Sequence, residues 1–185
     1  MEVSTSTVNK LQLTAVEDLD PISIYLEDFE PLVRRDKSVS NAGKITIECF
    51  GKSWSAYWGG MGAKNVSEFF TGAEVCYLVN CLDRGISSTV NAEGEELQSA
   101  LRASICEYRK SESYTKSEAR ALFDRVDDDV YDIHCDSDLF SDVIGCEWWT
   151  DFPQVENQKY VYLYLLVEAV QFGINQAAQS AMLKG

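Results

Sequence analysis

Aspartates and glutamates gather in one window of the chain, and they are the residues best able to do chemistry. Between Asp124 and Asp151 the sequence has ten carboxylates and one basic residue, so this acidic window carries a net charge of −9 over 28 residues. The single histidine of the chain, His134, lies inside the window in the segment DIHCDSD. Carboxylates at this density can hold a divalent cation, keep a protein soluble, or dock on a basic partner.

The first interpretation of the acidic window is a cation-binding loop. An EF-hand loop places oxygen ligands at alternate positions, followed by a glycine and a final glutamate. Loops that begin at Asp127 or at Asp136 have an aromatic residue at the fifth position and lack the glycine. A related hypothesis is a small hydrolase or nuclease that uses Mg²⁺ held near four side chains, His134, Asp132, Asp136 and Asp138.

The second interpretation is a solvated acidic face without a further role, and the third is a docking surface. Closely spaced carboxylates on a folded scaffold can occupy the sites that phosphates would use on a basic groove. The tryptophans that end the window point in different directions, so one of them can be exposed and anchor an interface. The residues expected at this surface are Asp127, Asp128, Asp129, Asp132, Asp136, Asp138, Asp142, Glu147, Trp148 and Trp149.

Two other motifs fail on their spacing. Gly51-Lys52-Ser53 resembles the end of a P-loop, but that motif needs a glycine at position 46, where the chain has threonine, and a helix after it. None of the six cysteines forms a C-x-x-C pair, so a structural zinc site is not expected. We therefore expect no catalytic residue, no metal and no cofactor. Because the sequence shows no export signal, we expect the cysteines to be reduced thiols in a cytoplasm.

Composition and charge restrict the classes of protein to which the chain can belong. Its 185 residues, with 45% hydrophobic and 25% charged residues, are typical of one globular domain. A net charge of −14 argues against broad contact with nucleic acid or an anionic membrane. The longest apolar run, from Tyr160 to Val167, is too short to span a membrane. The first residues do not have the pattern of a secretory signal, so we expect a cytoplasmic protein.

Alternating hydrophobicity predicts strands in the first third of the chain. Leu11–Val16, Ile22–Glu27, Lys44–Phe50 and Ser53–Trp58 alternate, and the last two form a hairpin around Gly51-Lys52. Residues 30–43 are mostly polar and are expected to form a loop.

Helical signals dominate the rest of the chain. Asn65 can cap a short helix, residues 93–110 are amphipathic, Thr115 and Glu118 form a capping box, and helices are expected at 139–144 and 157–180. The chain is predicted to be one α+β domain over residues 1–185, an N-terminal antiparallel β-sheet covered by C-terminal helices. In this domain residues 1–9 form a tail, 10–62 are mainly strands and 65–180 are mainly helices.

One segment resembles a known group of proteins. KITIECFGKSWSAYWGGMG, followed by SEFF at positions 67–70 and preceded by LDPISIYLEDF at 19–29, is similar to small accessory proteins of lambdoid and other enterobacterial phages and prophages. The resemblance covers residues 11–82 and supplies no catalytic residues. It implies a phage gene product that acts in the bacterial cytoplasm, where such proteins often block or redirect host proteins.

The leading hypothesis combines the resemblance with the acidic window. It is a non-enzymatic, anti-CRISPR-like inhibitor that acts as a nucleic-acid mimic. Its partner is a host protein with a basic nucleic-acid-binding surface, and it contacts neither nucleic acid nor membrane directly.

Overall fold

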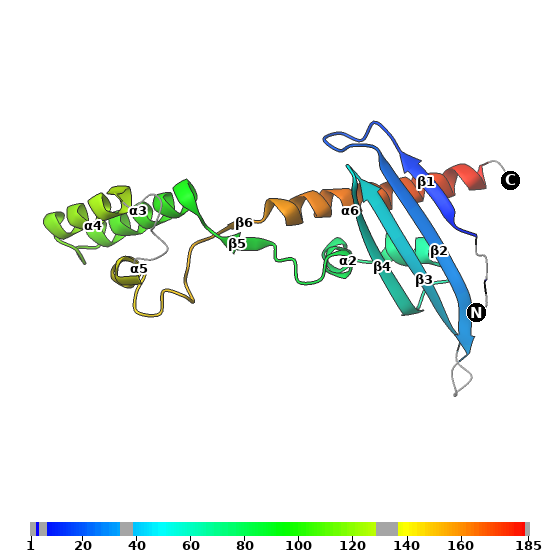
Figure 1. Cartoon of the computed structure of the whole chain (residues 1–185), viewed down its shortest axis with the longest axis horizontal. Helices are drawn as coiled ribbons and strands as arrows, with labels where there is room; N and C mark the ends of the chain where they lie inside the picture. The colour runs from blue at the N-terminus through cyan, green and yellow to red at the C-terminus, as the bar shows by residue number, and fades with distance from the viewer. Residues whose placement is uncertain (1–2, 4–6, 34–38, 129–136, 184–185) are drawn as a thin grey trace. The chain divides into compact units, whose positions relative to one another are not determined.

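The chain divides into two compact units, and the computed structural model describes residues 3, 7–33, 39–128 and 137–183 of it (Figure 1). The sheet unit comprises residues 1–86 and 158–185, and the inserted unit comprises Ser87–Asn157. Each unit has its own hydrophobic core, because no residue of either cluster comes from the other unit among the described residues.

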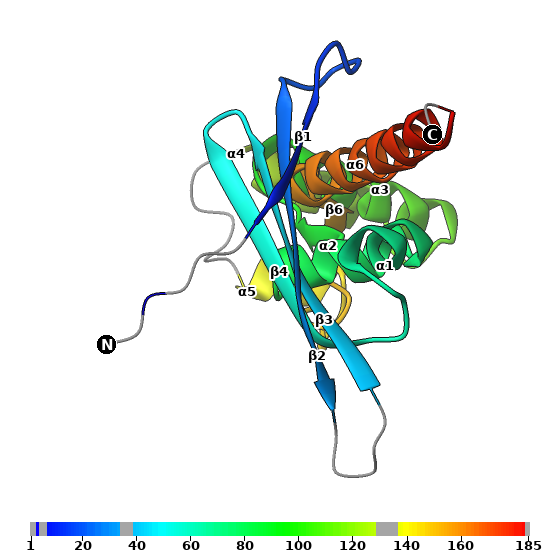
Figure 2. The same ribbon diagram turned by 90° about the vertical axis from the view of Figure 1, so that its right-hand side faces the viewer.

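The sheet unit is built on four antiparallel strands in the order β1-β2-β3-β4. They are β1 (Asn9–Leu13), β2 (Ile22–Val33), β3 (Val39–Cys49) and β4 (Lys52–Met61). Helices α1 (Val66–Gly72), α2 (Val75–Leu82) and α6 (Gln158–Met182) cover one face of this sheet (Figure 2). The predicted α+β class, with an N-terminal antiparallel sheet and later helices, is confirmed.

Two details of the sheet differ from the sequence prediction. Most of the expected loop at residues 30–43 is strand, because β2 continues to Val33 and β3 begins at Val39. The register shifts between Phe29 and Leu32, so Pro31 lies in an irregularity of the strand. Proline has no backbone N–H, and at such a position no regular hydrogen bond between the strands is lost. The β3–β4 turn has Phe50 and Gly51 at its centre, both with positive φ, one residue earlier than expected.

Alternation along the strands separates an apolar face from a polar one. The register aligns Leu11, Ile24, Ile47 and Trp54 in one row across the covered face. The next row, on the opposite face, aligns polar or amphipathic residues, namely Lys10, Tyr25, Thr46 and Ser55. The hairpin expectation for β4 is confirmed, because Ala56 and Trp58 are buried whereas Tyr57 is exposed.

Hydrogen bonds to side chains fix the first helix against the sheet. Asn65 caps α1 as predicted, since its side chain accepts a hydrogen bond of 2.8 Å from the Glu68 N–H. Asp28, on β2, accepts a 2.7 Å bond from the Val66 N–H. Two of the free N–H groups at the start of α1 are therefore satisfied by side chains.

The inserted unit contains a small sheet and three helices. Its strands β5 (Thr89–Asn91) and β6 (Gln154–Glu156) pair antiparallel, and its helices are α3 (Gly94–Lys110), α4 (Lys116–Asp128) and α5 (Ser137–Val143). The predicted apolar stripe of α3 is confirmed, because Leu97, Leu101 and Ile105 are buried. They pack with residues of α4 and α5 into the core of this unit.

Thr115 and Glu118 form the predicted capping box at the start of α4. The Glu118 carboxylate accepts a 2.8 Å bond from the Thr115 N–H, and the Thr115 hydroxyl accepts a 3.3 Å bond from the Glu118 N–H. The Thr115 side chain and then the Thr115 backbone N–H stabilise the charged carboxylate of Glu118 and lower its pKa. Among the helices in the described part of the chain, none is both long and apolar enough to cross a bilayer.

Gly43 is expected to tolerate no side chain. A Cβ at this position would lie 2.9 Å from Val66 Cβ and 3.2 Å from the Glu27 carbonyl oxygen, neither of which can rotate away. Gly43→Ala should therefore destabilise the sheet unit by about 1–3 kcal/mol, the usual cost of overpacking. Urea unfolding measures this change, and Gly62→Ala is the control because a Cβ there meets nothing within 4 Å. Equal stabilities of the two variants would contradict the close approach of α1 to β3.

The sheet unit is expected to fold without the inserted unit. The Asn157 N–H donates a 2.9 Å bond to the Ser88 carbonyl, so the chain enters and leaves the inserted unit on neighbouring strands. Replacement of residues 90–155 by an Asn-Gly turn should join Thr89 to Glu156 without strain. We expect circular dichroism and amide NMR spectra to show a folded sheet unit with cooperative unfolding. Loss of that cooperativity would favour the single domain predicted from the sequence.

Candidate interaction surface

Most of the excess negative charge belongs to the inserted unit. Ser87–Asn157 holds 17 Asp and Glu against 6 Lys and Arg, a net charge of −11, whereas the sheet unit has 13 against 10. Four carboxylates of the acidic window are exposed in the described part of the unit: Asp138, Asp142, Glu147 and Asp151. The charge is therefore a property of one unit and not of the whole chain.

The structure describes half of the residues that the sequence predicted for the docking surface. Asp138 and Asp142 lie on α5, and Glu147, Trp148 and Trp149 lie in the turns that follow it. The others fall outside the described residues, or belong to α4 without described side chains; they are Asp127, Asp128, Asp129, Asp132 and Asp136.

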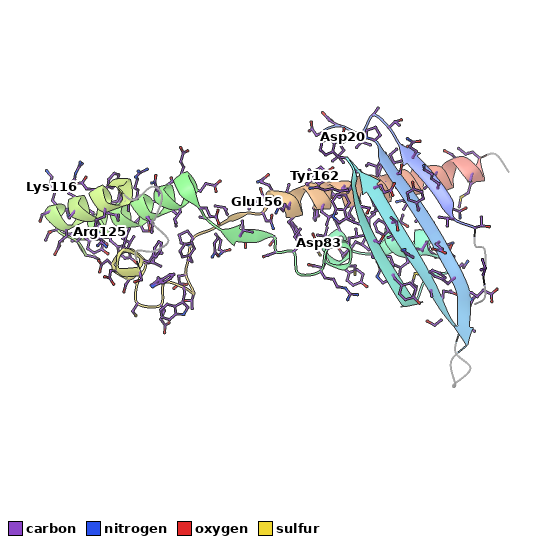
Figure 3. All side chains as sticks on the ribbon, viewed as in Figure 1. Asp20, Asp83, Lys116, Arg125, Glu156 and Tyr162 are labelled. Atoms are coloured by element: carbon purple, nitrogen blue, oxygen red, sulfur yellow. The ribbon has the colours of Figure 1, made fainter. Side chains whose placement is uncertain are left out.

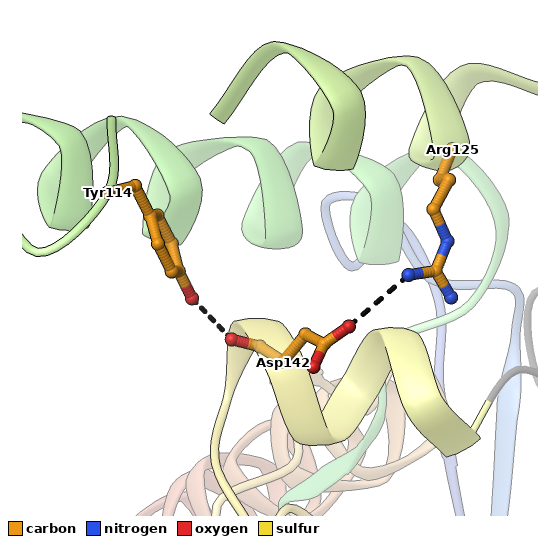
Figure 4. A network of polar contacts seen from close by, with 3 residues as sticks. All are labelled: Tyr114, Arg125 and Asp142. Carbon is orange, nitrogen blue, oxygen red and sulfur yellow. Dashed lines mark hydrogen bonds and ion pairs between the residues drawn. The ribbon is translucent and has the colours of Figure 1, made fainter. Parts of the chain in front are cut away.

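Asp142 holds α5 against α4 as well as carrying charge. Figure 3 marks Lys116 and Arg125 near the two ends of α4. The Arg125 guanidinium donates to the Asp142 carboxylate at 3.3 Å, and both side chains keep about half of their surface in solvent (Figure 4). Asp142 is therefore partly neutralised within the unit, and its contribution to an external partner is smaller than that of an unpaired carboxylate.

Tyr114 also holds α5 in place, through the backbone of Asp142. Its hydroxyl donates a hydrogen bond to the backbone carbonyl of Asp142 (Figure 4). Burial, and then the neighbouring groups Tyr108, Asp142 and Glu118, raise the pKa of Tyr114, so the hydroxyl keeps the proton that it donates. The sequence analysis did not identify Tyr114. It named Asp142 for the docking surface and counted Arg125 as the single base of the acidic window, but it did not predict that the two would pair.

An aromatic cluster joins Phe140 of α5 to three residues that follow this helix, Trp148, Trp149 and Phe152. Trp148 is half-buried, with its ring centroid 5.1 Å from that of Phe140 and 6.1 Å from that of Phe152. Trp149 packs edge-on against Trp148 at 5.9 Å and keeps 62% of its surface in solvent. As the sequence suggested, the two tryptophans diverge and one of them is exposed.

A short anchor turn, residues 145–151, presents the exposed tryptophan. Gly145 has φ +124°, which only glycine adopts readily, and its N–H still bonds to the end of α5 at Phe140. The Trp148 N–H donates to the Gly145 carbonyl at 3.0 Å, and the Thr150 N–H donates to the Glu147 carbonyl at 2.9 Å. These bonds fix the backbone on both sides of Trp149. The exposed carboxylates of Glu147 and Asp151 flank it in the sequence.

This arrangement is suited to contact with a partner. An exposed indole on a hydrogen-bonded turn, beside carboxylates, can bury apolar area in a partner while the carboxylates meet its cations. In the described residues no three His, Cys, Asp or Glu side chains are grouped so that they could hold a metal. Three of the four residues of the hydrolase hypothesis, His134, Asp132 and Asp136, lie outside the described residues, and the fourth, Asp138, is exposed on α5, so the hypothesis stays a prediction.

Comparison with known proteins gives the origin of the chain. No curated protein and no solved structure matches it. One family model, described as a phage family, matches residues 1–176, which is nearly the whole chain. The resemblance that the sequence suggested is therefore confirmed at the level of a phage protein, and the chain belongs to the Phage_phiTE_072 phage family.

Proposed function

We propose that the protein is a non-enzymatic phage interaction protein whose inserted unit docks on the basic, nucleic-acid-binding surface of a host protein. The observation that carries this proposal is the exposed Trp149, held on a packed aromatic cluster in the most acidic part of the chain. A large indole that is exposed and rigid loses little conformational entropy when it binds. Trp149 is thus suited to be the anchor of an interface.

Charge supplies the second element of the proposal. The inserted unit carries −11, so it attracts a cationic groove over a distance of about a Debye length, 8–10 Å at physiological salt. Such complementarity mainly accelerates association and excludes acidic partners. Asp138, Glu147 and Asp151 are exposed and are the described carboxylates best able to meet cations of the partner.

The phage family suggests where the protein acts. We place its origin among lambdoid and other enterobacterial phages and its site of action in the cytoplasm of the bacterial host. In that setting a nucleic-acid-acting defence protein offers the basic groove that an acidic mimic can occupy, and occupation would block or redirect the host protein.

Substitution of Trp149 and, separately, of the carboxylates that flank it should distinguish the contribution of the indole from that of the charges. We expect Trp149→Ala to weaken partner binding by about 2 kcal/mol, roughly thirtyfold in Kd, as for an interface hot spot. Glu147→Gln with Asp151→Asn should instead lower the association rate and flatten its dependence on salt. Host proteins are first captured on the tagged protein, and those that added duplex DNA releases are identified. The binding kinetics of each variant are then measured with the partner found in this way.

Matched variants on the sheet unit control for composition and net charge. Phe172→Ala removes an aromatic side chain that is 65% exposed, and Glu17→Gln with Glu168→Gln makes the same change in charge at exposed sites. Both controls should bind as the unmodified protein does. The proposal is wrong if DNA releases none of the captured proteins, or if Trp149→Ala binds the partner as tightly as Phe172→Ala.

A further inference from the structure

A second surface of the inserted unit differs in charge from the acidic window. Helices α3 and α4 pack side by side and leave an open groove of about 430 Å³ between them. The groove is lined by apolar and basic residues, Ile105, Cys106, Arg109, Lys110, Lys116, Ala119, Arg120 and Phe123. All of them precede the acidic window, so this surface is distinct from the one proposed to dock on the host protein.

The lining of the groove has the opposite charge to the rest of the unit. Four of its eight residues are cations and none is a carboxylate, although the unit as a whole carries −11. Arg102 adds a fifth cation nearby, with its guanidinium 5.6 Å from the centre of the Phe123 ring. Five of the six bases of the unit therefore gather at one groove.

Two carboxylates of α4, Glu118 and Asp124, already have partners within the unit. Glu118 caps the N-terminus of α4 through Thr115, and Asp124 pairs with Arg120 at 3.0 Å along the same helix. The Arg120–Asp124 pair is exposed, so it stabilises the unit little and competes weakly with an external carboxylate. An anionic ligand can therefore reach the cationic rim.

The shape and charge of the groove identify its occupant. An apolar floor selects an apolar side chain, and a cationic rim selects carboxylates beside it. On α4, Lys116 and Arg120 lie one helical turn apart, a spacing that glutamates four residues apart on a second helix would match. A nucleic acid would meet the net negative charge of the unit along its whole length, which disfavours it.

We propose that the α3–α4 groove binds an acidic amphipathic helix of a partner protein. The helix lies with its leucine-type residues on the half-buried Ala119 and Phe123, above the buried Ile105, and its glutamates toward the basic rim. This is the helix-in-groove mode of recognition, in which a pair of packed helices accepts a third. The protein then has two contact surfaces of opposite charge on one unit.

The test uses Cys106 as a reporter inside the groove. A synthetic peptide of about 18 residues, five helical turns, carries leucines at i, i+4, i+7 and i+11 with glutamates beside them. Alkylation of Cys106 by iodoacetamide is followed by peptide mapping, with the exposed Cys76 and Cys146 as reference thiols. At a peptide concentration tenfold above Kd, Cys106 should react about tenfold more slowly, because only the free protein reacts. The reference thiols should react at unchanged rates.

Charge reversal on the rim tests the specificity of the contact. Lys116→Glu with Arg120→Glu should weaken binding of the peptide about tenfold, since two exposed ion pairs with the peptide become repulsive contacts. Lys52→Glu with Lys64→Glu, at exposed positions of the sheet unit, changes the net charge equally and should have no effect. Circular dichroism checks that both variants keep their helices.

Four results would overturn the proposal. A scrambled isomer of the peptide could protect Cys106 equally, or its lysine-for-glutamate counterpart could protect Cys106 better. Dodecanoate could protect Cys106 where the acidic peptide does not, which would identify a small anionic amphiphile. Protection of Cys106 that grows with protein concentration in the absence of peptide would identify a second copy of the chain as the occupant. The groove residues lie outside the acidic window, so none of these results depends on the host-docking proposal.

Discussion

The pairing of β5 with β6 is the contact on which the inserted unit depends. It joins residues more than 60 positions apart, through the Ala92 N–H bond to the Pro153 carbonyl at 2.8 Å and the Asn157 N–H bond to the Ser88 carbonyl at 2.9 Å. Closing such a loop lowers the conformational entropy of the chain, and the pairing of three residues on each strand does not stabilise the unit enough to offset this loss. The cost is offset by the core inside the loop, where α3, α4 and α5 bury Leu101, Val126 and Phe140. Sheet and core therefore require each other.

Local patterns explain which elements could be predicted from the sequence. The alternation in KITIECF and SWSAYW sets the hairpin, and the pair of Thr115 and Glu118 sets the start of α4, because each signal acts within a few residues. The strands β5 and β6 carry no such signal, since three residues cannot show a period and their pairing is set by the core between them. The strand around Pro31 was missed for a related reason: a bulge admits proline where regular pairing would not.

The candidate site shows the same division between local and non-local signals. The density of carboxylates and the adjacent tryptophans were visible in the sequence, and the exposure of one indole followed from their adjacency. The network that holds α5 was not visible, because Tyr114 reaches Asp142 across 28 positions. The basic groove was also hidden. Its cations come from two helices, and glutamates that do not line the groove stand between them in the sequence.

Separation of charge within one small unit has a physical consequence for recognition. Both proposed contacts combine an apolar side chain with charges at its margin, so we expect apolar burial to supply most of the affinity and charge to decide which partner is accepted. A unit of −11 attracts cationic surfaces at long range, whereas the groove acts only within the Debye length of its own five cations. The two surfaces therefore respond differently to ionic strength. Salt weakens long-range attraction to the acidic window first, and it also screens the repulsion that an acidic helix meets as it approaches the groove.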